Sequence, residues 1–291
     1  MAVLGKRVEI ALDNILFATD FSPGAEKAGL YAKAIARRYG SRVHVVHIVD
    51  LSTIPQVPDA GICLDVLRKG GESGLSAARE QFAAAKIKVK TALAEALDPA
   101  KTILQIAHDE SVNLIVSGTR GHTGLARLAL GSIAEQLIHH AGCPVLTVGP
   151  EVPFHSAAGV FERIVYATDF SPEAAKAATV ALSFAQDSGA HIYLCHVLPR
   201  TGGDGLELTE KFTAALQRAV PDVAREWCEP ECIVEHGYAA DGILLLAQRV
   251  NADLIVIGTR RFSHWFDSFK AGIAYQVICA AKCAVLTIRG G

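Results

Sequence analysis

Residues 113–149 read NLIVSGTRGHTGLARLALGSIAEQLIHHAGCPVLTVG, the pattern of a strand, a glycine-containing loop, a helix and a second strand. The apolar run at 114–117 is long enough for a buried strand, and apolar residues recur at helical spacing after Ser132. A glycine loop that leads into a helix is where α/β proteins bind phosphate. Glycine lets the backbone approach an anion, and the first helical N–H groups point at it. The stretch therefore predicts an α/β fold with a phosphate-binding loop.

The chain contains a second copy of this organisation. ILFATDFSP at 15–23 returns as IVYATDFSP at 164–172, an offset of 149. NLIVSG at 113–118 returns as DLIVIG at 253–258, and here the offset is 140. The first copy therefore has a net nine extra residues in its middle, and we expect them in the Pro- and Gly-containing stretch 54–74.

Two copies of this length predict two tandem domains, 1–150 and 160–291, joined across 151–159. In the first copy we expect strands at 15–17, 43–49, 89–94, 114–117 and 145–148, and helices from Pro23 to a Gly40 stop, over 76–85, from Pro99 and over 133–141. Apolar strands that alternate with amphipathic helices indicate parallel sheets covered on both faces. The predicted fold is therefore two tandem doubly wound domains, each a mostly parallel five-stranded sheet flanked by helices.

Composition and charge narrow the classes of function. The chain has 291 residues, of which 51% are hydrophobic, and a formal net charge of −2 with no basic block. This argues against a nucleic-acid or anionic-membrane surface. Residues 1–10 lack an apolar signal core, and no run is long enough to cross a bilayer. We expect a cytoplasmic protein with no nucleic-acid or membrane partner.

The seven cysteines are too dilute for a disulfide scaffold. Cys228, Cys232 and His236 follow one another at intervals of four residues, which raises the question of a metal site. They lack the C-x-x-C loop of a zinc knuckle, and Pro230 argues against a shared helix face. No metal site is expected.

Ligands of parallel sheets bind beyond the carboxyl ends of the strands, where the strand order reverses. Asp20 closes the first strand and could accept hydrogen bonds from a base or ribose, and Ile48 ends the second and could form an apolar wall. The segment after the fourth strand would supply backbone, a helix start and cations for ribose and phosphate: Gly118, Arg120, Gly121, His122, Arg127, Gly131, Ser132 and Ile133. Two plainer readings remain open. Asp20 could be an extra acid at a helix start, and Gly118 and Gly121 could be turn glycines only.

The residues TDFS at 19–22, the G-x2-G-x9-G-S loop and the terminal CPVLTVG at 143–149 resemble the universal stress protein family. The resemblance covers nearly the whole chain as two tandem copies and implies a stress-response protein that binds ATP, with Mg²⁺, in the first domain. It assigns Ala18, Asp20 and Ile48 to adenosine, and it assigns ribose and phosphates to Gly118, Gly121, Gly131, Ser132 and Ile133. It also implies that the final strands, 145–148 and 285–288, pair edge to edge, and a homodimer is possible.

The second copy departs from this pattern. Gly258 remains, but Arg261, Ala271 and Gly272 stand where the second glycine, the third glycine and the serine are expected. A side chain at Arg261 would intrude where backbone must approach phosphate. Two readings stay open: a domain that stabilises the first, or a site for something other than ATP.

Three functions remain in view. The leading one is a protein that senses or signals through nucleotide occupancy. The second is a slow ATPase or adenylyl-transfer enzyme, and the third is a nucleotide-free interaction module. The sequence has no G-x4-G-K-[ST] loop and no clear pair of base and nucleophile. Turnover is therefore expected to be weak or absent.

Overall fold

The computed structural model divides the chain into two compact units, Ala11–Phe154 and His155–Gly291, the second of which includes the N-terminal residues up to Ile10. The backbone N–H of Ile10 donates to Ser183 Oγ over 3.2 Å within that second unit. The structure describes residues 10–54, 60–121, 130–154, 160–200, 205–226, 228, 230–259 and 272–290. No helix within these ranges is long and apolar enough to span a membrane.

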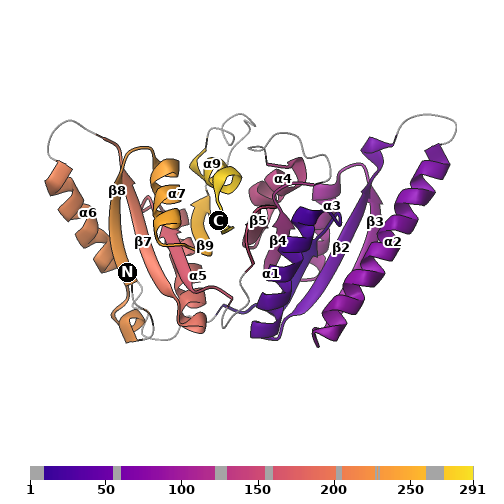
Figure 1. Ribbon diagram of the computed structural model, residues 1–291, viewed down its shortest axis with the longest axis horizontal. Helices are drawn as coiled ribbons and strands as arrows, with labels where there is room; N and C mark the ends of the chain where they lie inside the picture. The colour runs from indigo at the N-terminus through magenta and orange to yellow at the C-terminus, as the bar shows by residue number, and fades with distance from the viewer. Residues whose placement is uncertain are drawn as a thin grey trace. The chain divides into compact units, whose positions relative to one another are not determined.

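The first unit is a five-stranded parallel sheet with the order β3-β2-β1-β4-β5. Its strands are β1 (Asn14–Ala18), β2 (Arg42–Asp50), β3 (Val89–Ala96), β4 (Leu114–Gly118) and β5 (Val145–Val148). Its helices are α1 (Pro23–Tyr39), α2 (Ala60–Ala84), α3 (Pro99–Asp109) and α4 (Ser132–His140). Right-handed crossovers place α1 and α2 on one face and α3 and α4 on the other (Figure 1).

The second unit repeats this architecture with the order β10-β9-β6-β7-β8, again all parallel. Its strands are β6 (Arg163–Ala167), β7 (His191–Leu198), β8 (Pro230–His236), β9 (Leu254–Thr259) and β10 (Ala284–Arg289). Its helices are α5 (Pro172–Ser188), α6 (Gly205–Ala219), α7 (Ala239–Arg249) and α9 (Ile273–Ala280), with a short 3-10 helix at Asp222–Glu226. The predicted fold class of two tandem doubly wound domains is confirmed.

The first helix of each unit begins and ends as its sequence predicts. The Ser22 side chain accepts a hydrogen bond from the N–H of Ala25, and Pro23 is the first helical residue. Gly40 ends the helix at φ 70, in the left-handed region that glycine adopts without strain. Ser171, Pro172 and Gly189 play the same parts in α5.

The helix predicted at 76–85 is wrong in length, because α2 begins at Ala60 and runs for 25 residues. Its glycines do not end it. A Cβ on Gly71 would lie 2.8 Å from His47 Cδ2, and one on Gly74 would lie 2.6 Å from the Phe21 ring, so both let the helix approach its neighbours closely. The counterpart α6 has 15 residues. The extra residues of the first copy therefore lie mainly in a longer helix.

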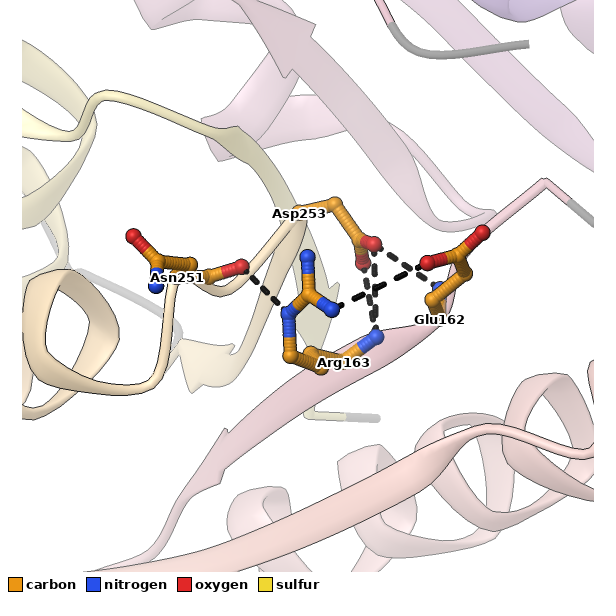
Figure 2. Close-up of polar contacts among 4 residues, drawn as sticks. All are labelled: Glu162, Arg163, Asn251 and Asp253. Carbon is orange, nitrogen blue, oxygen red and sulfur yellow. Dashed lines mark hydrogen bonds and ion pairs between the residues drawn. The ribbon is translucent and has the colours of Figure 1, made fainter. Parts of the chain in front are cut away.

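A carboxylate ties together the starts of two neighbouring strands in the second unit (Figure 2). Asp253 accepts the backbone N–H of Glu162 at 2.8 Å and that of Arg163 at 3.2 Å, and Arg163 Nε donates to the carbonyl of Asn251 at 2.8 Å. Burial raises the pKa of Asp253. In the first unit the neutral side chain of Asn113 links the equivalent strand starts, because its Oδ1 accepts the N–H of Asn14 at 2.9 Å.

Candidate functional site

The predicted site lies where β1 and β4 run side by side, the point at which strand order reverses in the first unit. Asp20 follows β1 and Gly121 follows β4, and they are in contact. A Cβ built on Gly121 would lie only 2.5 Å from Asp20 Oδ2. Two segments a hundred residues apart thus meet as the sequence predicts, and Gly121 admits no side chain unless the carboxylate moves.

A tight turn after β1 fixes the Asp20 carboxylate. Asp20 Oδ1 accepts the N–H of Ser22 at 3.0 Å, and Thr19 Oγ1 accepts the N–H of Phe21 at 3.0 Å. Phe21 has a φ of 61, a left-handed conformation that costs a non-glycine residue roughly 1–2 kcal/mol. The second unit has the same turn, with Phe170 at φ 61. This turn explains the TDFS motif of both copies, whether or not a ligand binds.

His47 and His196 hold the strand ends against these turns. His47 Nδ1 lies 2.8 Å from the carbonyl oxygen of Thr19, and His196 Nδ1 lies 2.8 Å from that of Thr168. A carbonyl can only accept, so Nδ1 carries the proton in both rings. The rings also pack on Phe21 and Phe170, with centroids 4.7 and 4.9 Å apart. Both histidines are therefore packed and hydrogen-bonded.

Gly118 has a packing role that its sequence motif conceals. A Cβ there would lie 3.2 Å from the backbone N of Ala25 and 3.2 Å from the carbonyl carbon of Gly24, at the start of α1. At Gly258 the corresponding approach to the N of Ala174 is 2.7 Å. Because the first helix of each unit crosses this strand end closely, both domains need the glycine. This explains why Gly258 persists in the copy whose loop is altered.

The start of α4 presents backbone N–H groups toward this edge. Gly131 is the N-cap residue, and among the described residues no side chain caps the helix, whereas Ser22 and Asp98 cap α1 and α3. The N–H of Gly131 donates to the carbonyl of Thr119 at 2.8 Å, which holds the helix start beside the end of β4. The macrodipole of α4 therefore favours an anion at this position.

Gly131 differs from Gly118 in what surrounds it. The nearest atom to a Cβ there is the carbonyl oxygen of Thr119 at 3.4 Å, an ordinary contact. The described fold thus gives no steric reason for glycine at this position, where glycine also serves as a favourable N-cap residue.

The other predicted residues occupy the same edge or lie outside the described structure. Ala18 is buried at the end of β1, Ile48 is half-buried in β2, and Arg120 is half-buried after β4. Ser132, the first residue of α4, is exposed, and Ile133 is half-buried. His122 and Arg127 lie outside the described residues, as do Arg261, Ala271 and the aromatic residues Phe262, Trp265, Phe266 and Phe269 of the second loop.

Two of the three residues spaced at intervals of four, Cys228 and His236, have ordinary hydrogen-bond partners. Cys228 Sγ donates to the carbonyl of Ala224 at 3.2 Å, and His236 Nε2 lies 3.0 Å from Thr209 Oγ1. Within the described ranges, no three His, Cys, Asp or Glu side chains group as metal ligands.

The comparisons with known proteins agree with both repeats. The model of the universal stress protein family matches residues 11–149 and 161–289. A universal stress protein of Methanocaldococcus jannaschii is 34% identical over 138 residues, which are 46% of this chain and 81% of that protein. One from Thermus aquaticus is 35% identical over 135 residues, 46% of this chain and 97% of that protein.

Solved structures show the same tandem fold. The crystal structure of a universal stress protein from Archaeoglobus fulgidus aligns with a TM-score of 0.75 at 21% identity, covering 97% of this chain and 100% of that one. The crystal structure of a putative universal stress protein from Pseudomonas aeruginosa aligns with a TM-score of 0.61 at 20% identity, covering 96% of this chain and 94% of that one. At these identities the likeness concerns the fold.

Proposed function

Since this chain belongs to the universal stress protein family, whose members act in stress responses, we propose that its N-terminal domain binds ATP with Mg²⁺ and acts through nucleotide occupancy. One observation carries the proposal. The Asp20 carboxylate, a glycine whose added Cβ would displace that carboxylate, and the α4 N-terminus, which no described side chain caps, come together where the strand order reverses.

The residues present suit the two halves of such a ligand. Asp20 is an acceptor for ribose hydroxyls or a base amine, and the half-buried Ile48 offers apolar surface to a base. At the other end, the N–H groups of Ser132 and Ile133 would hold phosphate oxygens, with the Ser132 hydroxyl as a further donor. Arg120 would supply positive charge. Mg²⁺ would neutralise part of the negative charge of the ATP phosphate chain.

Purified protein tests this proposal directly. Nucleotide extracted from the denatured chain and identified by mass spectrometry should be ATP. ADP or AMP as the dominant species would favour the alternative of slow hydrolysis or adenylyl transfer. A nucleotide-free chain that also fails to bind added Mg-ATP would refute the proposal and favour an interaction module.

Removing the Ser132 hydroxyl tests the phosphate end. Ser132→Ala should weaken Mg-ATP binding by roughly 1–3 kcal/mol, as for one hydrogen bond to a charged group. Its unfolding free energy without ligand should change little, because the Ser132 side chain is exposed and makes no side-chain cap of α4 among the described residues. Unchanged affinity would show that the Ser132 hydroxyl does not contact phosphate at the start of α4.

We also propose that the two domains associate through their final strands, β5 and β10. Each is the last strand of its own sheet and is short and apolar. Pairing two such edges would satisfy backbone donors and acceptors that otherwise template aggregation. Thr147→Pro deletes one backbone donor and should abolish cooperative unfolding of the whole chain. Fragments 1–150 and 160–291 that are monomeric and as stable as the intact chain would contradict this.

A further inference from the structure

The second domain contains a cavity of about 360 Å³ at the carboxyl ends of its strands. Its described walls come from the ends of β6, β7 and β9 and from the starts of α5, α7 and α9. They are mainly alanine, valine and isoleucine side chains with a few polar groups. The cavity walls include Ala167, Asp169, Val197, Ile257, Gly272 and Ile273. Ligand pockets range from about 300 to 1,000 Å³, so this one suits a small molecule.

Half of this wall repeats the proposed nucleotide site of the first domain. By the offset of the repeat, Ala167, Asp169 and Val197 correspond to Ala18, Asp20 and Ile48. These are the positions proposed above for the base and ribose. The turn that fixes the carboxylate is also kept, since Asp169 Oδ1 accepts the N–H of Ser171 at 3.0 Å. The second domain therefore keeps apolar side chains that could contact a ring and a carboxylate that could accept hydrogen bonds from hydroxyl or amine groups.

The other half has lost the hydroxyl that the first domain offers to phosphate. Gly272 replaces Ser132 at the helix start, and Ile257 adds an apolar side chain where the first domain has the buried Ser117. Arg261 replaces Gly121, the residue that contacts Asp20 in the first domain. The α9 N-terminus remains, but an exposed carboxylate at Asp169 now faces a mainly apolar wall. The Asp169 carboxylate can accept hydrogen bonds from hydroxyl and amine donors, as Asp20 can in the first domain.

We propose that the cavity of the second domain binds an unphosphorylated nucleoside. The choice of ligand rests on the proposed function, because the match to the first-domain site identifies the base-and-ribose half. The two domains then divide their ligands: nucleotide in the first, nucleoside in the second.

A matched pair of substitutions separates the two sites in the full-length chain. Ile48 and Val197 are equivalent strand-end residues, both half-buried, so phenylalanine at either should fill the local site. Val197 also packs against Gly242 of α7, so the folding of Val197→Phe is checked before titration. Adenosine is the probe, and it is titrated calorimetrically into Ile48→Phe and into the double variant that carries both Ile48→Phe and Val197→Phe. AMP is titrated into the same proteins as the control ligand. Circular dichroism and melting curves establish that each variant is folded. If Ile48→Phe fails to fold, Gly121→Arg replaces it as the block of the first site.

We expect Ile48→Phe to bind one adenosine per chain and the double variant with Val197→Phe to bind none. AMP should bind Ile48→Phe at least roughly tenfold more weakly than adenosine. In the same background Asp169→Asn should weaken adenosine by roughly tenfold or more, although its amide oxygen can still accept the Ser171 N–H. A folded Ile48→Phe that binds no adenosine, binding that survives in the double variant, or AMP binding as tight as adenosine would overturn the proposal.

These results are separable from a failure of the proposed function. Mg-ATP should bind Val197→Phe like the unsubstituted chain and should not bind Ile48→Phe. If ATP binds neither the unsubstituted chain nor Val197→Phe, the first-domain proposal fails. Adenosine binding to Ile48→Phe that Val197→Phe removes would still establish a second-domain site.

Discussion

Replacing Gly121 with alanine should weaken Mg-ATP binding about tenfold to a hundredfold. The added Cβ would lie 2.5 Å from Asp20 Oδ2, while carbon in ordinary contact needs roughly 1 Å more. The carboxylate must therefore turn away from the position in which its other oxygen accepts the Ser22 N–H. A hydrogen bond to a charged group contributes about 1.5–3 kcal/mol, and about 1.4 kcal/mol corresponds to tenfold in affinity.

Gly142→Ala is the matched control for this substitution. Gly142 lies in the same domain, and no atom comes within 4 Å of a Cβ built there. Calorimetric titration with Mg-ATP should give unchanged affinity for Gly142→Ala and the predicted loss for Gly121→Ala. Asp20→Ala should cause a comparable loss, and the two losses should not add, because both act through one carboxylate. Full affinity in Gly121→Ala, or additive losses in the double variant, would refute the role assigned to Asp20.

Three further predictions concern the second domain. Gly258→Ala should destabilise the chain by about 1–3 kcal/mol in denaturant unfolding, since its Cβ would meet the Ala174 backbone at 2.7 Å; unchanged stability would remove the packing role. Asp253→Asn should remove one pH dependence of stability. Because folding raises the pKa of Asp253, the native carboxyl contributes less stability as pH rises from about 3.9 through its folded pKa, so the stability of the variant relative to the native chain should rise over that range; a relative stability that does not change with pH would contradict this. Burial raises the pKa of Cys195 to about 12, so thiol reagents at pH 8 should label it only after unfolding, and rapid labelling of the native chain would contradict its burial.

The fold was predictable because its signals are local and occur twice. The Ser22-Pro23 start and the Gly40 end of α1 are capping chemistry that sequence shows directly, and Ser171, Pro172 and Gly189 repeat it. The length of α2 was not predictable from the same rules. Glycines inside it, such as Gly71, indicate a break locally, and only the position of His47 across the packing layer shows that they permit close contact.

The contact between Asp20 and the loop after the fourth strand was predictable from the sequence, but the different surroundings of the loop glycines were not. In sequence, Gly118, Gly121 and Gly131 form one motif, and nothing in their spacing separates them. The structure separates them by neighbour: helix α1 for the first, the Asp20 carboxylate for the second and no close obstacle for the third. The sequence left open a second-domain site for something other than ATP. The altered loop after Gly258 does not indicate that the strand-end residues around it line a cavity, which only the structure shows.

The stoichiometry of Mg-ATP binding tests the central claim most directly. Calorimetric titration of the full-length chain should give one site per chain, because only the first copy combines Asp20, a glycine at 121 and the Gly131-Ser132 helix start. That single site should disappear in Ile48→Phe and persist in Val197→Phe. Two equivalent sites would mean that the second domain also accepts phosphate, and no binding, or one site abolished by Val197→Phe alone, would contradict the assignment of ATP to the first domain.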